Sequence, residues 1–205
     1  MDSVISKPIT KWGELYATED VNMNIHMAST CLHYGQEVFE GLKAFRGADG
    51  KVRLFRVEEN AKRMINSGEY LKMAVPSVEL FTKACIEAVK LNADYIPPYG
   101  SGASLYLRPM LIGVGPQVGV KPSADYLFAV FVTPVGPYYK DGFNCIKVII
   151  DYDHDRAAPK GTGHVKVGGN YAASLDSGEI AHQKGFASVI FLDPATKQYI
   201  DECSA

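Results

Sequence analysis

The amino-acid sequence predicts an α+β fold, in which an antiparallel sheet is covered by helices and a second region follows. Three observations predict it. Strand-like runs flank a turn at 46–50, two helical patterns lie between residues 57 and 91, and two longer strand-like runs come after them. Strands grouped on either side of a pair of helices favour an antiparallel sheet over alternating β-α units.

The composition excludes several classes of function. The 205 residues suit one large domain or two small ones, and a hydrophobic content of 47% is ordinary for a protein with a core. A formal net charge of -2 predicts no nucleic-acid partner and no binding to an acidic membrane surface. No run has the length of a membrane span and no signal-peptide pattern is visible, so the expected location is the cytoplasm. The four cysteines form no C-x-x-C pair, so no metal site is expected.

The first elements are expected to be a strand, a helical turn and a hairpin. Apolar and polar residues alternate over 21–25, which predicts a half-buried strand, and 28–33 fits one helical turn. The runs 38–45 and 52–55 predict a hairpin, because a turn rich in glycine and aspartate separates them.

Two helices are expected next. The first covers 57–71, and the second follows Ser77, a residue type that caps helix N-termini. The residues expected to face the core in the first helix are Ala61, Met64, Ile65 and Leu71. In the second helix they recur three and four apart: Phe81, Ala84, Cys85, Ala88 and Leu91.

Two further strands complete the first domain. They are expected at 103–112 and 126–133, joined by a Gly/Pro-rich loop at 113–122. The first domain then covers 1–133, and the segment 134–144, which is rich in proline and glycine, is the expected interdomain loop.

Residues 145–205 are expected to begin a second domain. Strands are predicted at 145–152, 187–192 and 198–200, and a helix at 172–184. A region of about 60 residues is at the low end of what folds alone. Because the last strand ends close to the last residue, this domain is expected to be incomplete.

One lysine in the second region suggests chemistry. Lys166 lies in a glycine-rich stretch at 161–171 and is followed closely by Asn170 and Tyr171. The order of residues fits neither a P-loop nor a dinucleotide fingerprint. Burial lowers the pKa of a lysine, and a neutral amine is a nucleophile toward carbonyl compounds. The alternative is an exposed lysine in a flexible loop.

Four further candidate sites can be interpreted either as ordinary structural or surface residues or as binding residues. Tyr106 and Arg108 point to one face of a strand, where they fit either a carboxylate ligand or a structural ion pair. The acidic run at 151–155 lacks the spacing of a calcium loop and is read as a solvated strand end. On their own, Arg63 reads as an exposed helix arginine and Glu202 as a solvated carboxylate.

A series of motifs in one order carries a resemblance to a known family. The chain resembles the branched-chain amino-acid aminotransferases, pyridoxal-phosphate enzymes of fold type IV, from about residue 30 to the end. The motifs are HYGQEVFEGLKAF at 33–45, VRLFR at 52–56, NAKRM at 60–64, SLYLRP at 104–109, PVGPY at 134–138 and KVGGNY at 166–171.

The resemblance implies a small N-terminal α+β domain, an interdomain loop and the beginning of a larger cofactor-binding domain. Lys166 matches the catalytic lysine that binds pyridoxal 5'-phosphate covalently and then moves a proton on the substrate. Glu202 matches the carboxylate that pairs with the pyridine nitrogen. Arg63 matches a ligand of the cofactor phosphate, and Tyr171 matches a hydroxyl near the phenolic oxygen.

A substrate pocket and a homodimer are also implied. The positions that match the family's substrate pocket are Tyr34, Phe39, Tyr106, Arg108 and Tyr138. Val118 and Val120 match apolar residues that the family lends to the pocket of the partner subunit. Apolar walls suit an aliphatic side chain, which is selected through buried apolar area.

The implied reaction transfers the amino group of L-leucine, L-isoleucine or L-valine to 2-oxoglutarate, giving a branched-chain 2-oxo acid and glutamate. The family's large domain continues beyond the point that matches Ala205, so the 205-residue chain alone is expected to be weakly active or inactive. Two alternatives stay open. One is another fold type IV enzyme, a D-amino-acid aminotransferase or an aminodeoxychorismate lyase, and the other is a non-catalytic dimerisation fragment.

Overall fold

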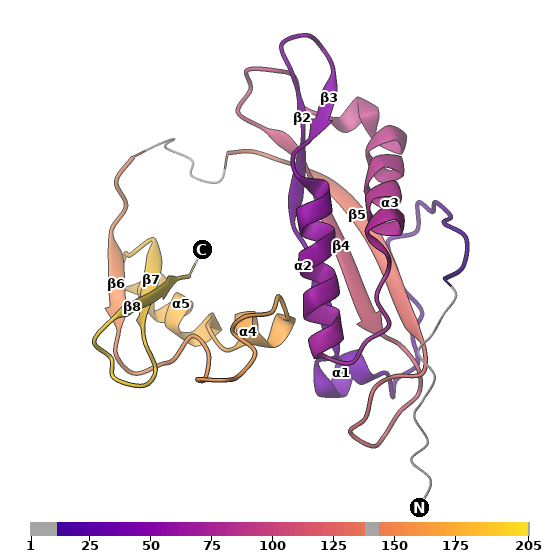
Figure 1. Cartoon of the computed structure of the whole chain (residues 1–205). Helices are drawn as coiled ribbons and strands as arrows, with labels where there is room; N and C mark the ends of the chain where they lie inside the picture. The colour runs from indigo at the N-terminus through magenta and orange to yellow at the C-terminus, as the bar shows by residue number, and fades with distance from the viewer. Residues whose placement is uncertain (1–11, 138–143, 205) are drawn as a thin grey trace, which may run out of the picture. The chain divides into compact units, whose positions relative to one another are not determined.

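The computed structural model describes residues 12–137 and 144–204, and the chain divides into two compact units after Gly136 (Figure 1). Each unit has its own sheet. The expected interdomain loop began at residue 134, whereas the last strand of the first unit extends to Val135.

Unit 1 is built on a five-stranded sheet in which all the pairings are antiparallel. Its centre is the long strand β4 (Ser104–Gly113), which pairs along its whole length with β5 (Tyr126–Val135). The other edge of β4 is shared by β1 (Glu37–Phe39) and β2 (Leu42–Arg46), and β2 continues into a hairpin with β3 (Val52–Leu54). The predicted hairpin is therefore confirmed.

The expected strand at 38–45 is interrupted. β1 ends at Phe39 and β2 begins at Leu42, so Glu40 and Gly41 lie outside both strands. The Glu40 side chain is fully buried, and its backbone N–H donates to the carbonyl of Pro109 at 2.8 Å. A buried carboxylate needs polar partners that the alternation of a regular strand does not supply.

The prediction of a strand at 21–25 is wrong. Residues 21–24 are exposed and form no strand, and the Asp20 carboxylate accepts the backbone N–H of Asn22 at 2.9 Å. Such a local turn competes with strand pairing. The expected helical turn is confirmed as α1 (Thr30–Tyr34).

Two helices, α2 (Val57–Tyr70) and α3 (Val78–Leu91), lie against one face of this sheet (Figure 1). Ser77 caps α3 as expected, because its hydroxyl accepts the N–H of Leu80 at 3.1 Å. The expected core position Leu91 is wrong, since 65% of this residue is exposed. Successive residues turn by about 100°, so the buried face passes through Val89 instead. The core of unit 1 consists mainly of apolar residues from these helices and from β4, among them Ala61, Met64, Phe81, Cys85, Leu105, Leu107 and Leu111.

Unit 2 contains a three-stranded sheet and two short helices. β6 (Val148–Asp151) is parallel to β7 (Ser188–Leu192), and β8 (Ile200–Cys203) is antiparallel to β7. The expected strand at 145–152 is shorter, and the one at 198–200 lies further along the chain. Between β6 and β7 stand α4 (Gly168–Ala172) and α5 (Leu175–Gln183).

The single helix expected at 172–184 is divided around Ser174. The hydroxyl of Ser174 donates to the carbonyl of Tyr171 at 2.9 Å, a local bond that competes with the regular helical pattern. Beyond the break, Ala181 of α5 packs with Val189 and Phe191 of β7 in a small buried cluster. The helix and strand therefore form the small core of unit 2.

Candidate functional site

Lys166 lies between two buried valines, just before α4. Its neighbours Val165 and Val167 are each 4% exposed. The two valines anchor the backbone on either side of Lys166, whose own side chain is only partly buried. Its Nζ donates to the hydroxyl of Tyr171 at 2.6 Å and lies 4.9 Å from the centre of the same ring. The amine therefore stands beside an aromatic hydroxyl.

The buried side chain of Asn170 holds the lysine loop in place. Its Nδ2 donates to the carbonyls of Thr162 and Val165 at 2.7 and 2.8 Å. Its Oδ1 accepts the hydroxyl of Thr162 at 2.6 Å. These bonds close the chain between Thr162 and Asn170 into a fixed loop around Lys166. The sequence motif contained Asn170, but sequence reasoning gave it no role.

Glu202 lies on β8, and its side chain is 54% exposed. The Nε atom of Arg156 lies 3.5 Å from Oε2 of Glu202, and the guanidinium carbon lies 5.1 Å from the centre of the Tyr171 ring. Three residues proposed from the sequence, Lys166, Tyr171 and Glu202, are therefore linked in one cluster. Arg156, which links them, was not foreseen.

The turn before β8 is organised by Asp193. Its carboxylate accepts the backbone N–H groups of Thr196, Gln198 and Tyr199 at 2.7 to 2.9 Å, and also the hydroxyl of Thr196. The N–H of Tyr199, with the other donors, holds the pKa of the Asp193 carboxyl well below its usual range. The turn positions β8 and therefore Glu202.

We expect this turn to loosen in acid. Because the folded-state pKa is depressed, the carboxylate stabilises the turn above its ordinary pKa of about 4, and this contribution is lost as the pH falls below that value. Amide hydrogen-exchange protection of 198–203 should fall between about pH 5 and about pH 2, with most of the loss below the ordinary pKa. In Asp193→Asn the protection should be low at both pH values, whereas Asp176→Asn should behave like the unchanged chain. If protection in Asp193→Asn fell with acid as much as in the unchanged chain, the Asp193 carboxylate would not be the group that stabilises this turn.

In unit 1, Arg63 is held by the buried carboxylate of Glu40. Its Nε and Nη2 atoms donate to the two Glu40 oxygens at 2.6 and 2.7 Å, a bidentate pair. The Nδ2 of Asn60 donates to the same carboxylate at 2.8 Å. Burial raises the pKa of the nearby Cys85 thiol to about 12, and the charge of Glu40 adds to this effect. The pair leaves the Arg63 side chain 54% exposed, so this cation is rigid but accessible.

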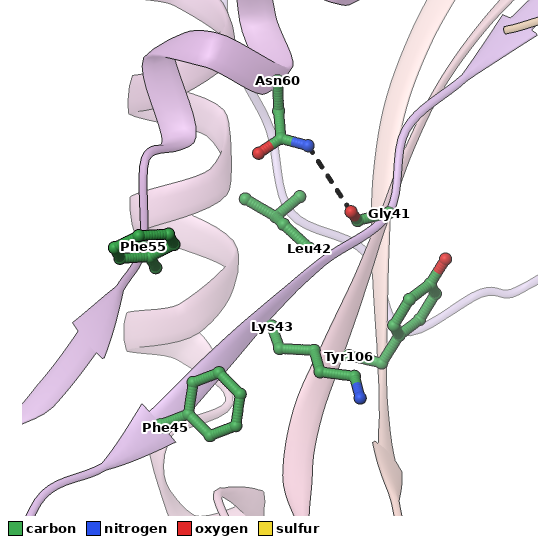
Figure 2. Close-up of a pocket in the computed structure, with 7 residues that line it drawn as sticks. All are labelled: Gly41, Leu42, Lys43, Phe45, Phe55, Asn60 and Tyr106. Carbon is green, nitrogen blue, oxygen red and sulfur yellow. Dashed lines mark hydrogen bonds between the residues drawn. The ribbon is translucent and has the colours of Figure 1, made fainter. Parts of the chain in front are cut away.

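Phe39, Tyr106 and Arg108 lie together on the sheet. The Tyr106 hydroxyl accepts Nε and Nη2 of Arg108 at 3.0 and 2.8 Å. The Arg108 guanidinium also stacks on Phe39, 4.6 Å from its ring centre. Tyr106 lines an open cavity of about 310 Å³ with residues from β2 and α2 (Figure 2). Its other lining residues are Gly41, Leu42, Lys43, Phe45, Phe55 and Asn60.

Gly41 is needed for Tyr106 to occupy this position. A Cβ at residue 41 would lie 2.4 Å from the Tyr106 hydroxyl, closer than van der Waals contact allows. We expect Gly41→Ala to displace the Tyr106 ring and break its contact with Arg108. Gly41→Ala should therefore lower the free energy of unfolding by about 1 kcal/mol less when residue 106 is already Phe than when it is Tyr. Additive losses in urea unfolding would contradict this close approach, and Gly13→Ala is a control, because nothing lies within 4 Å of its added Cβ.

The other pocket candidates are placed differently. The Tyr34 hydroxyl donates to the carbonyl of Val118. Val118 and Val120 are 83% and 85% exposed, so their side chains have few contacts within this chain. Tyr138 lies outside the described residues.

The acidic run at 151–155 forms ion pairs within the run and with two residues further along the chain. His154 lies 3.0 Å from Asp151 and 3.4 Å from Asp176, and Lys197 pairs with Asp155. Within the described residues, no group of three or more His, Cys, Asp and Glu side chains is arranged to hold a metal ion. In the same residues, no helix combines the length and apolar character needed to cross a membrane.

Comparison with known proteins places this geometry in a family. The amino-transferase class IV family model matches residues 37–205. Branched-chain-amino-acid aminotransferases from Haemophilus influenzae and Helicobacter pylori are 52% and 51% identical, each over 95% of this chain. These matches cover 58% and 57% of the two relatives, so the chain spans less than two thirds of their length.

Solved structures agree with the sequence relatives. The branched-chain amino acid aminotransferase of Escherichia coli has a TM-score of 0.70 and 28% identity, over 88% of this chain and 56% of the other. A second branched-chain amino acid aminotransferase, solved with pyridoxamine 5'-phosphate, has a TM-score of 0.69 and 28% identity over 88% and 57%. The expected fold, an α+β arrangement like that of fold type IV aminotransferases, is therefore confirmed. The chain belongs to the amino-transferase class IV family, and within it resembles the branched-chain amino-acid aminotransferases.

Proposed function

We propose that this chain is the lysine-bearing part of a branched-chain amino-acid aminotransferase that uses pyridoxal 5'-phosphate. The protein would transfer the amino group of L-leucine, L-isoleucine or L-valine to 2-oxoglutarate. The observation that carries the proposal is the contact of Lys166 Nζ with the Tyr171 hydroxyl at 2.6 Å, in a chain of the class IV family. The cofactor is supported by the relative solved with pyridoxamine 5'-phosphate.

The residues of unit 2 fit this cofactor chemically. When bound, pyridoxal phosphate supplies an aldehyde and an electron-accepting ring. Lys166 would hold the cofactor through its amine, and its Nζ, once the substrate amine has displaced it from the aldehyde carbon, would move the proton of the substrate Cα. The Tyr171 hydroxyl, 2.6 Å from that Nζ, would bind the phenolic oxygen. Glu202 presents a partly exposed carboxylate that would accept the pyridine N–H.

Unit 1 offers groups for the phosphate and the substrate. Arg63 would bind the cofactor phosphate through the accessible part of its guanidinium, while Glu40 fixes the other edge. Phe39 and Tyr106 supply apolar surface for an aliphatic side chain. Arg108 supplies the cation that the second carboxylate of 2-oxoglutarate requires. This pairing of aromatic walls with an arginine supports the use of both substrates in alternate half-reactions.

The exposed valines support a homodimer. Val118 and Val120 lie in a loop whose backbone is held by the Tyr34 hydroxyl, so the loop presents two apolar side chains at a defined place. Exposed apolar residues on a fixed loop are typical of an interface. We propose that the partner subunit covers them.

The proposed dimer can be tested with charged substitutions. In Val118→Asp/Val120→Asp we expect the dimer to dissociate at least about tenfold more readily in sedimentation, because two charges would be buried in an apolar contact. Val21→Asp is the control, since Val21 is also exposed but lies outside this loop. An unchanged dimer would contradict the assignment, and so would a wild-type chain that is monomeric at every concentration.

The sequence predicts a cytoplasmic location, and the names of plant relatives include chloroplastic and mitochondrial enzymes.

A substrate panel tests the proposed activity. The chain is loaded with pyridoxal phosphate, and L-leucine and D-alanine are added separately without an amino acceptor. Conversion of the cofactor to its amine form by L-leucine alone, followed by its return with 2-oxoglutarate, is the expected result. Conversion by D-alanine would favour a D-amino-acid aminotransferase. Absence of conversion by either amino acid, in a chain that binds the cofactor, would favour a non-catalytic role for these 205 residues.

A further inference from the structure

Arg156 is a buried cation that the proposed reaction does not yet use. Only 8% of the residue is exposed. Burying a guanidinium costs free energy unless its donors and its charge are compensated. Its Nη1 donates to the carbonyl of Asn170 at 2.5 Å, whereas its buried Nε makes no hydrogen bond within the described residues. One backbone hydrogen bond does not compensate the burial of the Arg156 charge, so the charge needs a further partner.

The orientation of this guanidinium is determined on two sides. The carbonyl of Asn170 fixes one edge, and the Tyr171 ring lies against it with 5.1 Å between the guanidinium carbon and the ring centre. A guanidinium is planar and rigid, so two contacts determine where its remaining donors point. On its Nε side, the Nε atom lies 3.5 Å from Oε2 of Glu202. This separation is an ion pair without a hydrogen bond.

The ion pair restrains a carboxylate that is otherwise exposed. Glu202 is 54% exposed and lies on β8, whose residues are all exposed. A long exposed side chain samples several rotamers, and an adjacent fixed cation favours those that direct one oxygen toward it. When Oε2 faces Arg156, Oε1 is left to accept a hydrogen bond from another group. Tyr171 is oriented by the same cation.

We propose that Arg156 is a positioning residue that aligns Tyr171 and Glu202 together for the two polar atoms of the pyridoxal ring. This inference rests on the proposed function. The phenolic oxygen and the ring nitrogen of the cofactor lie at fixed positions of one aromatic ring, so their two protein partners must be placed in a matched way. A single buried guanidinium that contacts both partners supplies this match.

The first test needs no cofactor. Amide hydrogen exchange of the 205-residue chain is compared with Arg156→Met, Arg156→Lys and Lys184→Met. In Arg156→Met we expect about tenfold faster exchange in peptides that contain Tyr171 and in those that contain Glu202, since local opening no longer breaks an ion pair. Arg156→Lys should show part of this change. Lys184→Met is the control: it removes a cation of unit 2 that is exposed, and it should leave the exchange of both peptides unchanged.

The pattern of exchange decides whether Arg156 links the two segments. A change confined to the peptide with Tyr171, a uniform change over unit 2, or no change would overturn the proposal. If Arg156→Met does not fold, Arg156→Lys still decides, because a shorter flexible cation loses the fixed geometry while it retains the charge.

The second test measures coupling in cofactor binding. We expect Arg156→Met to weaken the affinity for pyridoxal phosphate about tenfold, but less than about threefold when Glu202 is already Gln. Equal effects in both backgrounds would mean that Arg156 does not act through Glu202, and would overturn the proposal. If the wild-type chain binds no cofactor at Lys166, the proposed function fails, while hydrogen exchange still decides whether Arg156 aligns the two segments.

Discussion

Lys166→Ala is expected to abolish covalent attachment of pyridoxal phosphate to this chain. The amine beside the Tyr171 hydroxyl is the only group in this site that we assign to the cofactor aldehyde. Without it, turnover by any active form of the protein should fall by about 10³-fold or more, as when a nucleophile is removed. The measurement is the phosphopyridoxyl absorbance that stays with the chain after borohydride reduction and denaturation.

A matched lysine variant controls for general labelling. Lys160 lies just before the glycine-rich stretch and is exposed, and Lys160→Ala should retain the full absorbance. Equal retention in Lys166→Ala and Lys160→Ala would contradict the assignment, because the label would then be spread over surface lysines. Tyr171→Phe should retain attachment but weaken it, since it removes a hydrogen bond and leaves the amine.

Arg63→Ala is expected to cost about 3 kcal/mol in the free energy of unfolding of unit 1, because it leaves the buried Glu40 carboxylate without its cation. Asn60 and the backbone N–H of Gly41 still donate to Glu40, but they carry no charge. Urea unfolding measures the loss. Arg56→Ala is the control, because Arg56 pairs with Glu59 at 3.9 Å on the surface, where a change within about 0.5 kcal/mol is expected.

A second substitution separates stability from cofactor binding. Adding Glu40→Gln to Arg63→Ala should recover part of the lost stability, because the buried group is then neutral. The double variant should still bind pyridoxal phosphate weakly if Arg63 holds the phosphate. Recovery of both properties would mean that Arg63 acts only through the fold, and no recovery of stability would contradict the buried-charge explanation.

Local patterns predicted the main elements of the fold. The hairpin, the two helices and the two long strands follow from periodicity, a turn rich in glycine and the Ser77 cap, which are all local signals. The errors arise where a single side chain overrides the pattern. Glu40 interrupts the expected strand at 38–45 because its carboxylate is buried with Arg63, 23 residues later. No spacing rule shows this pairing in advance.

The site was predicted through resemblance, and its supports were not predicted. Lys166, Tyr171 and Glu202 come from matched motifs, and the structure of unit 2 brings them together. Asn170 and Arg156 were missed, because an asparagine after two glycines and an arginine after an acidic run look ordinary until the chain folds. Asn170 acts through side-chain bonds within its own loop and Arg156 through a contact with the distant Glu202, and the order of residues alone reveals neither.

The most direct test of the account is to map where pyridoxal phosphate binds the wild-type chain. The 205-residue chain is incubated with the cofactor, reduced with borohydride, digested and analysed by peptide mass. We predict a phosphopyridoxyl group on Lys166 at close to one per chain, with little on the other lysines. A label spread evenly over the lysines, or none at all, would contradict the claim that this chain carries the cofactor-binding lysine.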